Sequence, residues 1–408
     1  MKFLYTIFIR IYYLIILIAS PFNPKAKQWI TGRRKPDFPS VSKGEKIIWV
    51  HAASLGEFEQ GRPVIEFIKK NYPEYKILLT FFSPSGYEVR KNYSEADYVY
   101  YIPLDTSKNA VHFLNHFHPE MAIVIKYEYW YNFLNQLSVF NIPYFFISAI
   151  YRPGQIFFKN YGGWFKNHLQ GAKHIFCQDE KSKILLISVG IQQVTLAGDT
   201  RFDRVLDVTS NPKKVEAVEA FSRKGRIIIA GSSWEPEEII LEDYLQTAPE
   251  DVKLIIAPHL IDKQHIDKIL TLFKSFNPFL LSKTDSNTNY SEARVLIIDA
   301  IGFLMHLYQY GKIAVIGGGF GKGLHNTLEA ATFGNPVLFG PNYEKFNEAK
   351  ELIKLGGAFT FSDKKEFKDL MDNLLNSEKN YQEASAIAKN YVIEKSGATG
   401  KIVAELFG

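Results

Sequence analysis

Short apolar runs recur along the chain, and each is followed by a turn rich in glycine, serine or proline and then by an amphipathic stretch. The runs are continuous rather than alternating, which is typical of strands buried on both faces of a parallel sheet. The stretches between them have helical spacing, as at Val64 to Lys70. In the first half of the chain the predicted strands are 47–50, 77–81, 121–125, 144–147, 174–177 and 194–197.

The same pattern restarts after a polar segment, with predicted strands at 226–230, 252–257, 295–298, 313–316 and 336–339, and one or two helices between Tyr381 and Phe407. A chain of 408 residues is also long for one core. We therefore predict an α/β protein of two Rossmann-like domains, 23–206 and 226–408, joined by a linker at 207–225. In such sheets ligands bind beyond the carboxyl ends of the strands.

The first twenty residues have a different pattern. Phe3 to Ala19 is apolar apart from Thr6 and Arg10, and a cluster of lysines and arginines follows it. The run is short for a bilayer span, which takes about 20 apolar residues, and no A-x-A cleavage site follows it. We expect residues 1–22 to form a retained anchor that lies on or marginally spans the membrane, with the body on the cytoplasmic side because the positive charges follow. A buried first helix is the alternative.

Composition narrows the class of partner. The net charge is +5, from 48 Lys and Arg against 43 Asp and Glu, which suits an anionic membrane or phosphorylated ligands but is too small to suggest nucleic acid. Aromatic residues make up 15% of the chain, which fits ring stacking, membrane contact or an aromatic-rich core. The single cysteine, Cys177, excludes an internal disulfide, and no Cys/His spacing suggests a structural zinc.

The turn after the first predicted strand reads H-A-A-S-L-G-E and contains Ser54, Gly56 and Glu57. Gly56 would allow a tight turn with close backbone approach. Glu57 lies at the start of a helix and is a candidate general base if burial raises its pKa. The alternative is an ordinary glutamate that complements the helix dipole. Pro63 predicts that the regular helix begins only near Gly61.

Two more turns in the first half contain polar groups at strand ends. Ser83 and Ser85, in S-P-S-G, could hold a phosphate or a sugar hydroxyl, or could simply cap a helix. Glu128, in Y-E-Y-W, follows the strand at 121–125. It could lie across one pocket from Glu57 as a second carboxylate, and a solvated or salt-bridged Glu128 is the alternative.

Arg201, in G-D-T-R-F-D, could neutralise a leaving phosphate or a substrate carboxylate with its planar fork. An ion pair with Asp199 or Asp203 at a hinge is the alternative. Ser232 and Ser233 follow a strand of the second half in a turn of small residues, where they could meet a nucleotide phosphate.

The most specific segment is G-G-G-F-G-K-G-L-H-N-T-L-E-A-A at 317–331, which follows a predicted strand. Gly318 and Gly319 offer backbone N–H groups, and a helix starting near Asn326 would add its positive end, so the segment favours phosphate. Glu329, one turn into that helix, could accept hydrogen bonds from ribose hydroxyls. The segment is neither a Walker A loop nor a clean G-x-G-x-x-G, and a purely structural turn is the alternative.

In this order, the motifs resemble the bacterial 3-deoxy-D-manno-octulosonic acid (Kdo) transferase family over the whole chain. The resemblance implies a GT-B fold with two domains facing a cleft, the first for a lipid acceptor and the second for CMP-Kdo. It implies an inverting glycosyltransferase that moves Kdo to a lipid A precursor, lipid IVA, in lipopolysaccharide biosynthesis. The expected location is the cytoplasmic side of the inner membrane, and no metal, other cofactor or nucleic acid is expected.

By this resemblance Glu57 matches the catalytic base, Glu128 the second acidic residue, and Asn326 and Glu329 the donor-binding helix. The remaining candidates divide between the acceptor, with Ser54, Gly56, Ser83 and Ser85, and the donor, with Arg201, Ser232, Ser233, His259, Gly318 and Gly319. His259 is included as a partial substitute, because the family's P-R-H-P-E-R segment reads A-P-H-L-I-D here. Tyr131 replaces an expected proline, and Arg201 stands where lysine is frequent.

Three alternatives stay open on the sequence. A GT-B transferase for a UDP- or GDP-sugar would need a second basic contact near the glycine-rich segment, and Lys322 could supply one. A nucleotide-sugar 2-epimerase would share the architecture but lack the anchor. A membrane-tethered binding protein without catalysis would keep its function when Glu57 is replaced.

Overall fold

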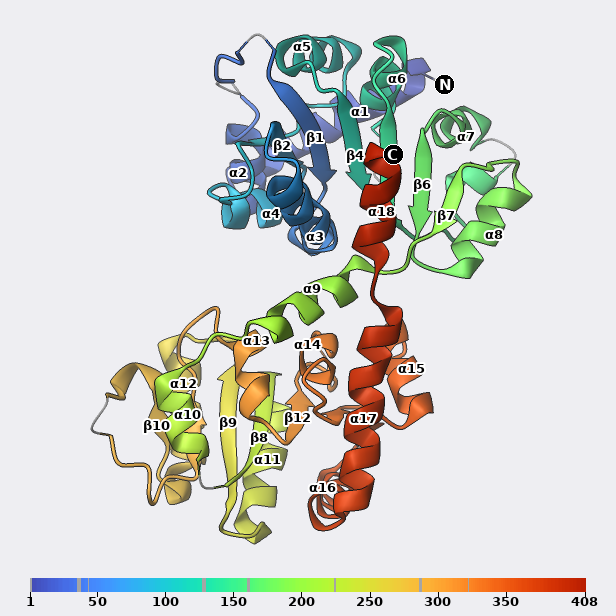
Figure 1. Ribbon diagram of the computed structural model, residues 1–408. Coiled ribbons are helices and arrows are strands. Elements are labelled where there is room, and N and C mark those ends of the chain that lie inside the picture. Colours follow the sequence, from blue (N-terminus) through green and yellow to red (C-terminus); the bar gives the residue numbers. More distant parts are fainter. Residues whose placement is uncertain are drawn as a thin grey trace. The chain divides into compact units, whose positions relative to one another are not determined.

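The computed structural model describes residues 2–34, 38–42, 44–126, 130–159, 162–223, 225–285, 288–321 and 323–408. The chain forms two compact units, and each contains a seven-stranded sheet flanked by helices (Figure 1). Unit 1 consists of Met1–Asp203 with Ser396–Gly408, and unit 2 of Arg204–Lys395. The chain therefore leaves unit 1, builds unit 2 and returns.

The sheet of unit 1 has the strand order β3-β2-β1-β4-β5-β6-β7, and all neighbouring strands are parallel. The direction of winding reverses between β1 and β4, which makes their carboxyl ends the expected ligand site. The strands are β1 (Lys46–Ala52), β2 (Tyr75–Phe81), β3 (Tyr98–Tyr101), β4 (Met121–Ile125), β5 (Tyr144–Ala149), β6 (His174–Cys177) and β7 (Val194–Leu196).

Helices cover both faces of this sheet because its strands are apolar on both sides. One core joins β1 and β2 to α3 and α18, and the other packs the opposite side against α5 and α6. The helices are α1 (Lys2–Ala19), α2 (Pro24–Thr31), α3 (Leu55–Asn71), α4 (Pro84–Arg90), α5 (Ser107–Phe117), α6 (Tyr131–Val139), η1 (Ile156–Phe158), α7 (Gly163–Gln170), α8 (Glu180–Ser188) and α18 (Ala398–Phe407). Helix α9 (Thr200–Ser210) runs across the boundary into unit 2.

The sheet of unit 2 repeats the design, with the order β10-β11-β9-β8-β12-β13-β14 and its reversal between β8 and β12. Its strands are β8 (Arg226–Ser233), β9 (Val252–Pro258), β10 (Phe279–Leu280), β11 (Val295–Ile297), β12 (Ile313–Ile316), β13 (Val337–Phe339) and β14 (Ala358–Thr360). Its helices are α10 (Glu216–Ser222), α11 (Glu235–Thr247), α12 (Lys263–Leu272), η3 (Lys274–Phe276), η4 (Leu281–Lys283), α13 (Leu304–Leu307), η5 (Tyr308–Tyr310), α14 (Leu328–Ala331), α15 (Asn347–Leu355), α16 (Lys364–Asn376) and α17 (Glu378–Lys395).

Every strand predicted from the apolar runs is present, and the last helical stretch is two helices, α17 and α18. Three strands were not predicted, namely β3, β10 and β14, and all three lie at sheet edges. Edge strands are only partly covered, so their sequences lack the continuous apolar signal of the central strands. The half-buried Y-V-Y-Y of β3 is an example.

The predicted domain boundaries differ from the observed units at the C-terminus and at the linker. Helix α18 belongs to unit 1, where Ala398, Ile402 and Val403 are buried beside α3 rather than in the second domain. The side chain of Asp203 fixes its start by accepting hydrogen bonds from the Gly397 and Thr399 N–H groups at 2.5 and 2.7 Å. The segment 207–225, predicted as a linker, contains the end of α9 and all of α10 and belongs to unit 2.

Helix α1 occupies most of the predicted anchor. Its Ile9 is buried, and Tyr12 and Tyr13 pack against Trp29 of α2. Across the described residues, we find no helix that combines the length and the apolar character needed to cross a bilayer.

The prediction that Pro63 delays helix α3 was wrong, because α3 begins at Leu55 and continues through Pro63. Burial of Phe58, Val64 and Ile65 against the sheet offsets the hydrogen bond that the proline cannot donate. Gly61 brings the helix close to β4, since a Cβ at this position would lie 2.1 Å from Cδ1 of Ile125.

Gly61→Ala should therefore destabilise unit 1, because the buried Ile125 side chain has little room to move. The matched control is Gly56→Ala on the same helix, where a Cβ meets nothing within 4 Å. We expect Gly61→Ala to lower the free energy of unfolding by roughly 1–3 kcal/mol relative to the control. Urea unfolding followed by circular dichroism measures the difference, and equal midpoints would contradict the close packing of α3 on β4.

Candidate active site

One peptide group, that of Ala53, joins two of the predicted motifs at the carboxyl edge of the first sheet. Its N–H donates to Oε2 of Glu57 at 2.7 Å. Its carbonyl accepts a hydrogen bond from the N–H of Ser83, also at 2.7 Å. The turn after β1 and the turn after β2 are thus held together, as the parallel order of these strands requires.

The carboxylate of Glu57 lies in the first turn of α3 and is half-buried. Burial raises its pKa, while the hydrogen bond from Ala53, the positive charge of Lys126 and the Ser54 backbone act in the opposite direction. The net result is a raised pKa. A carboxylate with a raised pKa is a stronger base than a free glutamate, and the ordered Ala53 contact fixes its orientation.

The other acceptor candidates lie in the same two turns. Ser54 is the N-cap residue of α3, and its side chain makes no capping bond. Gly56 is exposed with open space around it, so the expected close backbone approach at this position is not found. Ser83 caps α4 by accepting from the Ser85 N–H at 3.2 Å, and the two hydroxyl oxygens lie 2.9 Å apart. The capping role considered for S-P-S-G is therefore present.

The third motif follows β4, and Glu128 lies outside the described residues. Its flanks are described. Lys126 has a left-handed backbone with φ of 65° and donates its N–H to Ile147 O at 2.8 Å. Trp130 donates its indole N–H to Nε2 of His51 at 2.8 Å. Lys126 and Trp130 are thus each hydrogen-bonded to the sheet or to its carboxyl edge.

The hydrogen bond from Trp130 also fixes the tautomer of His51. Because Nε2 accepts, the proton of the neutral ring is on Nδ1, which donates to Oγ1 of Thr80 at 2.9 Å. Burial, assisted by the nearby Arg33 and opposed by Thr80, lowers the pKa of His51 to about 3. The ring is neutral at physiological pH, so His51 positions the Trp130 side chain and is not a proton carrier.

In unit 2, the glycine-rich segment follows β12 and is held by a glutamate of α11. The Gly318 N–H donates to Oε1 of Glu237 at 2.9 Å, and the Trp234 N–H donates to Oε2 at 3.2 Å. A Cβ at Gly318 would lie 2.2 Å from the Gly323 carbonyl oxygen. The Gly318 N–H is therefore not free for a phosphate as predicted, because it is already bonded within the protein.

Ser232 and Ser233 end β8 beside this segment, but they differ in orientation. Ser232 has a left-handed backbone with φ of 52° and a half-buried side chain. Ser233 is buried, and its hydroxyl donates to Oε1 of Glu238 at 2.8 Å. The predicted contact of the Ser233 hydroxyl with a ligand is thus not supported, because that hydroxyl points into the protein. His265 lies on the other side of Glu238, with Nε2 3.1 Å from the same oxygen.

His259 is brought to the same edge by β9, and its N–H donates to Ser233 O at 3.0 Å. Its ring stacks on Trp234 at 4.6 Å and on His325 at 4.5 Å between centroids. The Trp234 indole N–H donates to Nε2 of His325 at 3.2 Å. Burial and the neighbouring His259 lower the pKa of His325 to about 4. This cluster is an uncharged aromatic surface at the end of the sheet.

Asn326 and Glu329 lie together, with the Asn326 amide donating to Oε1 of Glu329 at 2.9 Å. Burial raises the pKa of Glu329, against the hydrogen bond from Asn326 and the charge of Arg204. The helix here, α14, spans only Leu328–Ala331, so the expected contribution of a helix dipole is small. Gly319 is packed against Gly340, whose N lies 2.5 Å from a Cβ built at Gly319.

Arg201 is engaged in an ion pair, which was the alternative considered for it. Its Nη2 lies 2.7 Å from Oδ2 of Asp199, and its Nε donates to the same oxygen at 2.8 Å. Thr200 donates its hydroxyl to Gln60 O of α3, so the G-D-T-R-F-D segment is anchored to the helix that carries Glu57. These contacts give Arg201 a structural partner within unit 1.

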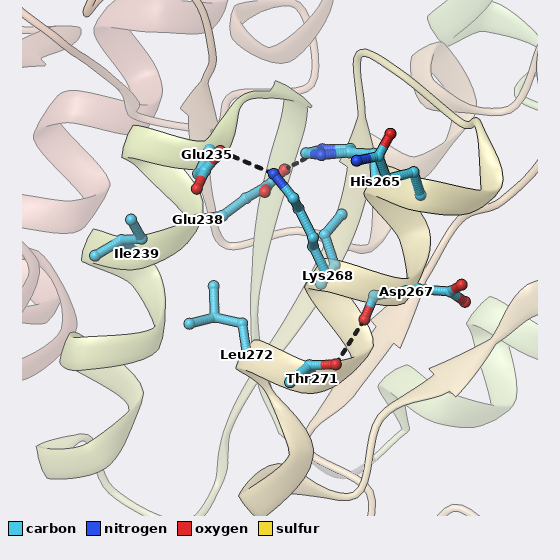
Figure 2. A pocket seen from close by; sticks show the side chains of 10 residues that line it. Glu235, Glu238, Ile239, His265, Asp267, Lys268, Thr271 and Leu272 are labelled. Carbon is cyan, nitrogen blue, oxygen red and sulfur yellow. Dashed lines mark hydrogen bonds and ion pairs between the residues drawn. The ribbon is translucent and has the colours of Figure 1, made fainter.

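A cavity of about 540 Å³ lies between α11 and α12 on unit 2 (Figure 2). Its lining includes Ile239 and Leu272 together with the charged pair Glu235 and Lys268, whose atoms are 3.6 Å apart. None of the predicted donor residues lines it. The cavity therefore belongs to the helical face of the unit and not to the carboxyl edge of its sheet.

The sequence analysis missed the groups that hold the turns in place. Glu237 and Glu238 are buried and bind the turns after β12 and β8. Their signal was present, because a run of acidic residues one turn into a helix after a strand indicates capping. His51 opens the H-A-A-S-L-G-E motif but was given no role there, and Arg204, whose charge acts on Glu329, lay outside every predicted motif.

The two units, each a doubly wound parallel sheet with polar groups at the switch point, define a GT-B architecture. UDP-GlcNAc 2-epimerase from Neisseria meningitidis, solved with bound UDP-GlcNAc, matches with a TM-score of 0.61 over 88% of this chain and 99% of that one, at 20% identity. At that identity the match bears on the fold alone. The predicted GT-B fold is confirmed.

Sequence comparison then separates transferase from epimerase. The family model described as 3-Deoxy-D-manno-octulosonic-acid transferase (kdotransferase) matches residues 29–204. The 3-deoxy-D-manno-octulosonic acid transferase of Aquifex aeolicus is 30% identical over 365 residues, covering 87% of this chain and 94% of that protein. The enzyme of the same name from Haemophilus influenzae is 26% identical over 380 residues, covering 87% and 85%. The chain belongs to the Kdo transferase family and is a glycosyltransferase.

The Glu237 bridge, meaning the two hydrogen bonds that its carboxylate accepts from the Gly318 and Trp234 N–H groups, can be tested with a substitution that conserves the shape of the side chain. Glu237→Gln keeps one acceptor but turns an amide NH₂ toward one of the two N–H donors, so the turn at 317–321 should loosen. We expect faster hydrogen exchange of the Gly318 amide and a loss of about 1–3 kcal/mol of stability. Glu235→Gln on the same helix is the control, because its surface ion pair should contribute less than about 1 kcal/mol. Equal exchange in the two variants would contradict the bridge.

Proposed function

We propose that this enzyme transfers Kdo from CMP-Kdo to a lipid A precursor, lipid IVA, in lipopolysaccharide biosynthesis, with inversion at the anomeric carbon and with Glu57 as the base. Membership in the family supports the sugar and the reaction type. The observation that carries the catalytic assignment is the Glu57 carboxylate, fixed by the Ala53 N–H and raised in pKa by burial.

The chemistry asks for a proton acceptor on the acceptor side. An acceptor hydroxyl oxygen attacks the anomeric carbon, its proton passes to the Glu57 carboxylate, and the bond from the anomeric carbon to the CMP phosphate oxygen breaks. CMP leaves with that electron pair as a phosphate anion. The anomeric centre carries oxocarbenium-like positive charge in the transition state, and a positioned base contributes typically about 10²–10⁴-fold.

On the donor side, the proposal retains Asn326 and Glu329 for the ribose, since their polar atoms lie together at the end of the second sheet. The His259, Trp234 and His325 cluster offers flat, uncharged rings at the same edge. The predicted phosphate contacts at Ser233 and Gly318 are withdrawn, because their polar hydrogens are bonded to Glu238 and Glu237.

We also propose that the enzyme works at the cytoplasmic face of the inner membrane and that α1 lies on the lipid surface. One side of this helix exposes apolar side chains at helical spacing, namely Leu4, Phe8, Ile11, Ile15 and Ile18, and Phe22 follows them. Arg10, Lys25 and Lys27 are exposed on the same helical pair and suit anionic headgroups.

Mass spectrometry of the lipid product tests the proposal. The purified enzyme incubated with CMP-Kdo and a tetra-acylated lipid A precursor should give mass gains in Kdo steps. Glu57→Gln keeps an oxygen for the Ala53 N–H but cannot take a proton, so turnover should fall by about 10²–10⁴-fold. Glu59→Gln, two residues along and paired with Arg90 at 2.7 Å, is the control and should retain activity. No gain with the wild type would reject this donor and acceptor.

The pH dependence of kcat/KM tests how the charge of Lys126 affects the pKa of Glu57. A base must be ionised, so kcat/KM should fall as pH drops through the pKa of Glu57. Because the charge of Lys126 lowers that pKa, Lys126→Met should raise it and move the acid limb of the profile to higher pH. Lys126→Arg keeps the charge and should leave the limb in place. An unchanged acid limb in Lys126→Met would contradict the electrostatic effect of Lys126 on Glu57.

A further inference from the structure

Asp105 is a buried carboxylate that sequence reasoning did not single out, and it lies in unit 1 between β3 and α5. Only 2% of the residue is exposed. Its Oδ1 accepts from the Phe133 N–H at 3.0 Å, and its Oδ2 accepts from the Asn132 N–H at 3.1 Å. These are the free N–H groups of the first turn of α6, so Asp105 caps that helix from another segment of the chain.

The third donor to Asp105 comes from α1. The Tyr5 hydroxyl donates to Oδ2 at 2.5 Å, across 100 residues of sequence. No lysine, arginine or histidine pairs with Asp105 within the part of the chain that the structure describes. The carboxylate is therefore stabilised by the amino end of α6 and by the Tyr5 hydroxyl. Burial raises its pKa to about 6, although the hydrogen bonds from Tyr5, Asn132 and Phe133 act in the opposite direction.

Helix α6 starts at Tyr131, directly after the Y-E-Y-W segment that contains Glu128. The buried side of α1 contacts this region in a second way. The Tyr12 ring stacks on Phe82 at 6.1 Å between centroids, and Phe82 lies 4.6 Å from Trp130. The inner face of α1 thus contacts Phe82, which follows β2, and Phe82 in turn contacts Trp130, the N-cap residue of α6.

The outer face of the same helix is apolar and exposed. Leu4 and Phe8 flank Tyr5 on the helix and are 61% and 63% exposed. One helix therefore presents an apolar surface on one side and a hydrogen bond to the buried cap of α6 on the other.

We propose that Tyr5 and Asp105 are positioning residues that couple contact of α1 with a lipid surface to the first turn of α6, and so to the acceptor side of the site. This inference rests on the proposed membrane contact of α1. When lipid holds α1 against the body of unit 1, the Tyr5 hydroxyl completes the set of donors around Asp105 and the α6 cap is tightened. Without that bond the carboxylate has two donors, and the cap opens more often.

Hydrogen exchange of the Asn132 and Phe133 amides tests the coupling without donor or acceptor sugar. The full chain is compared with and without vesicles of phosphatidylglycerol and phosphatidylethanolamine. In the wild type, vesicles should slow exchange at the start of α6. In Tyr5→Phe, which keeps the ring contacts with Trp164 and Phe165, exchange on vesicles should be about 2- to 12-fold faster than in the wild type.

Tyr13→Phe is the matched control, because it makes the same change on α1 at a ring that packs on Trp29. Among the described residues we find no hydrogen bond from the Tyr13 hydroxyl. In Tyr13→Phe the exchange of the Asn132 and Phe133 amides should therefore match that of the wild type. Equal protection in Tyr5→Phe and Tyr13→Phe, or no effect of vesicles on the wild type, would overturn the proposal whether or not Kdo transfer is observed.

Steady-state kinetics provide a second test of the coupling between α1 and α6. Tyr5→Phe should lower kcat for a lipid acceptor presented in vesicles, with the KM for the nucleotide sugar unchanged, and Tyr13→Phe should match the wild type in both. A rise in the donor KM in Tyr5→Phe, or an unchanged kcat, would contradict a positioning role on the acceptor side.

Discussion

The peptide group of Ala53 holds together two turns at the carboxyl edge of the first sheet, where the proposed base lies. Its N–H orients the Glu57 carboxylate and its carbonyl holds the Ser83 N–H, each at 2.7 Å. Both bonds use backbone atoms at the end of a central strand, where packing from two cores leaves little freedom. The Glu57 carboxylate, the proposed base, is thereby positioned at the end of the sheet, and burial raises its pKa.

In unit 2 the turns at the carboxyl edge of the sheet are held by side chains instead of by a backbone peptide group. Glu237 and Glu238, adjacent on α11, bind the turn after β12 and the end of β8. Buried carboxylates are costly unless their oxygens receive hydrogen bonds, and here both receive them from the turns that they hold. In unit 1, Asp105 does the same for the first turn of α6. Three buried acidic groups thus fix the polar edges of the two sheets.

The fold could be predicted largely from sequence, because central parallel strands are continuous apolar runs with turns at fixed positions between them. The edge strands β3, β10 and β14 were missed since partial exposure removes that signal. The return of α18 to unit 1 depends on the hydrogen bonds of Asp203 to the Gly397 and Thr399 N–H groups, a contact across nearly the whole second half of the chain. The turns that contain Glu57 and Ser83 lie together because β1 and β2 are neighbouring parallel strands. The inward turn of the Ser233 hydroxyl and the bonded Gly318 N–H could not be predicted, because they depend on which partner lies beneath each turn.

In the proposed reaction Glu57 acts as a base in a single displacement and not as a nucleophile that carries the sugar. The most direct measurement is the anomeric configuration of the newly formed glycosidic bond, determined by NMR on the isolated product. We expect a configuration opposite to that of the donor, because the acceptor oxygen attacks the face away from the departing phosphate. A product with the configuration of the donor would mean either a covalent sugar intermediate or attack from the face of the departing phosphate, and it would contradict a single displacement with Glu57 as the base.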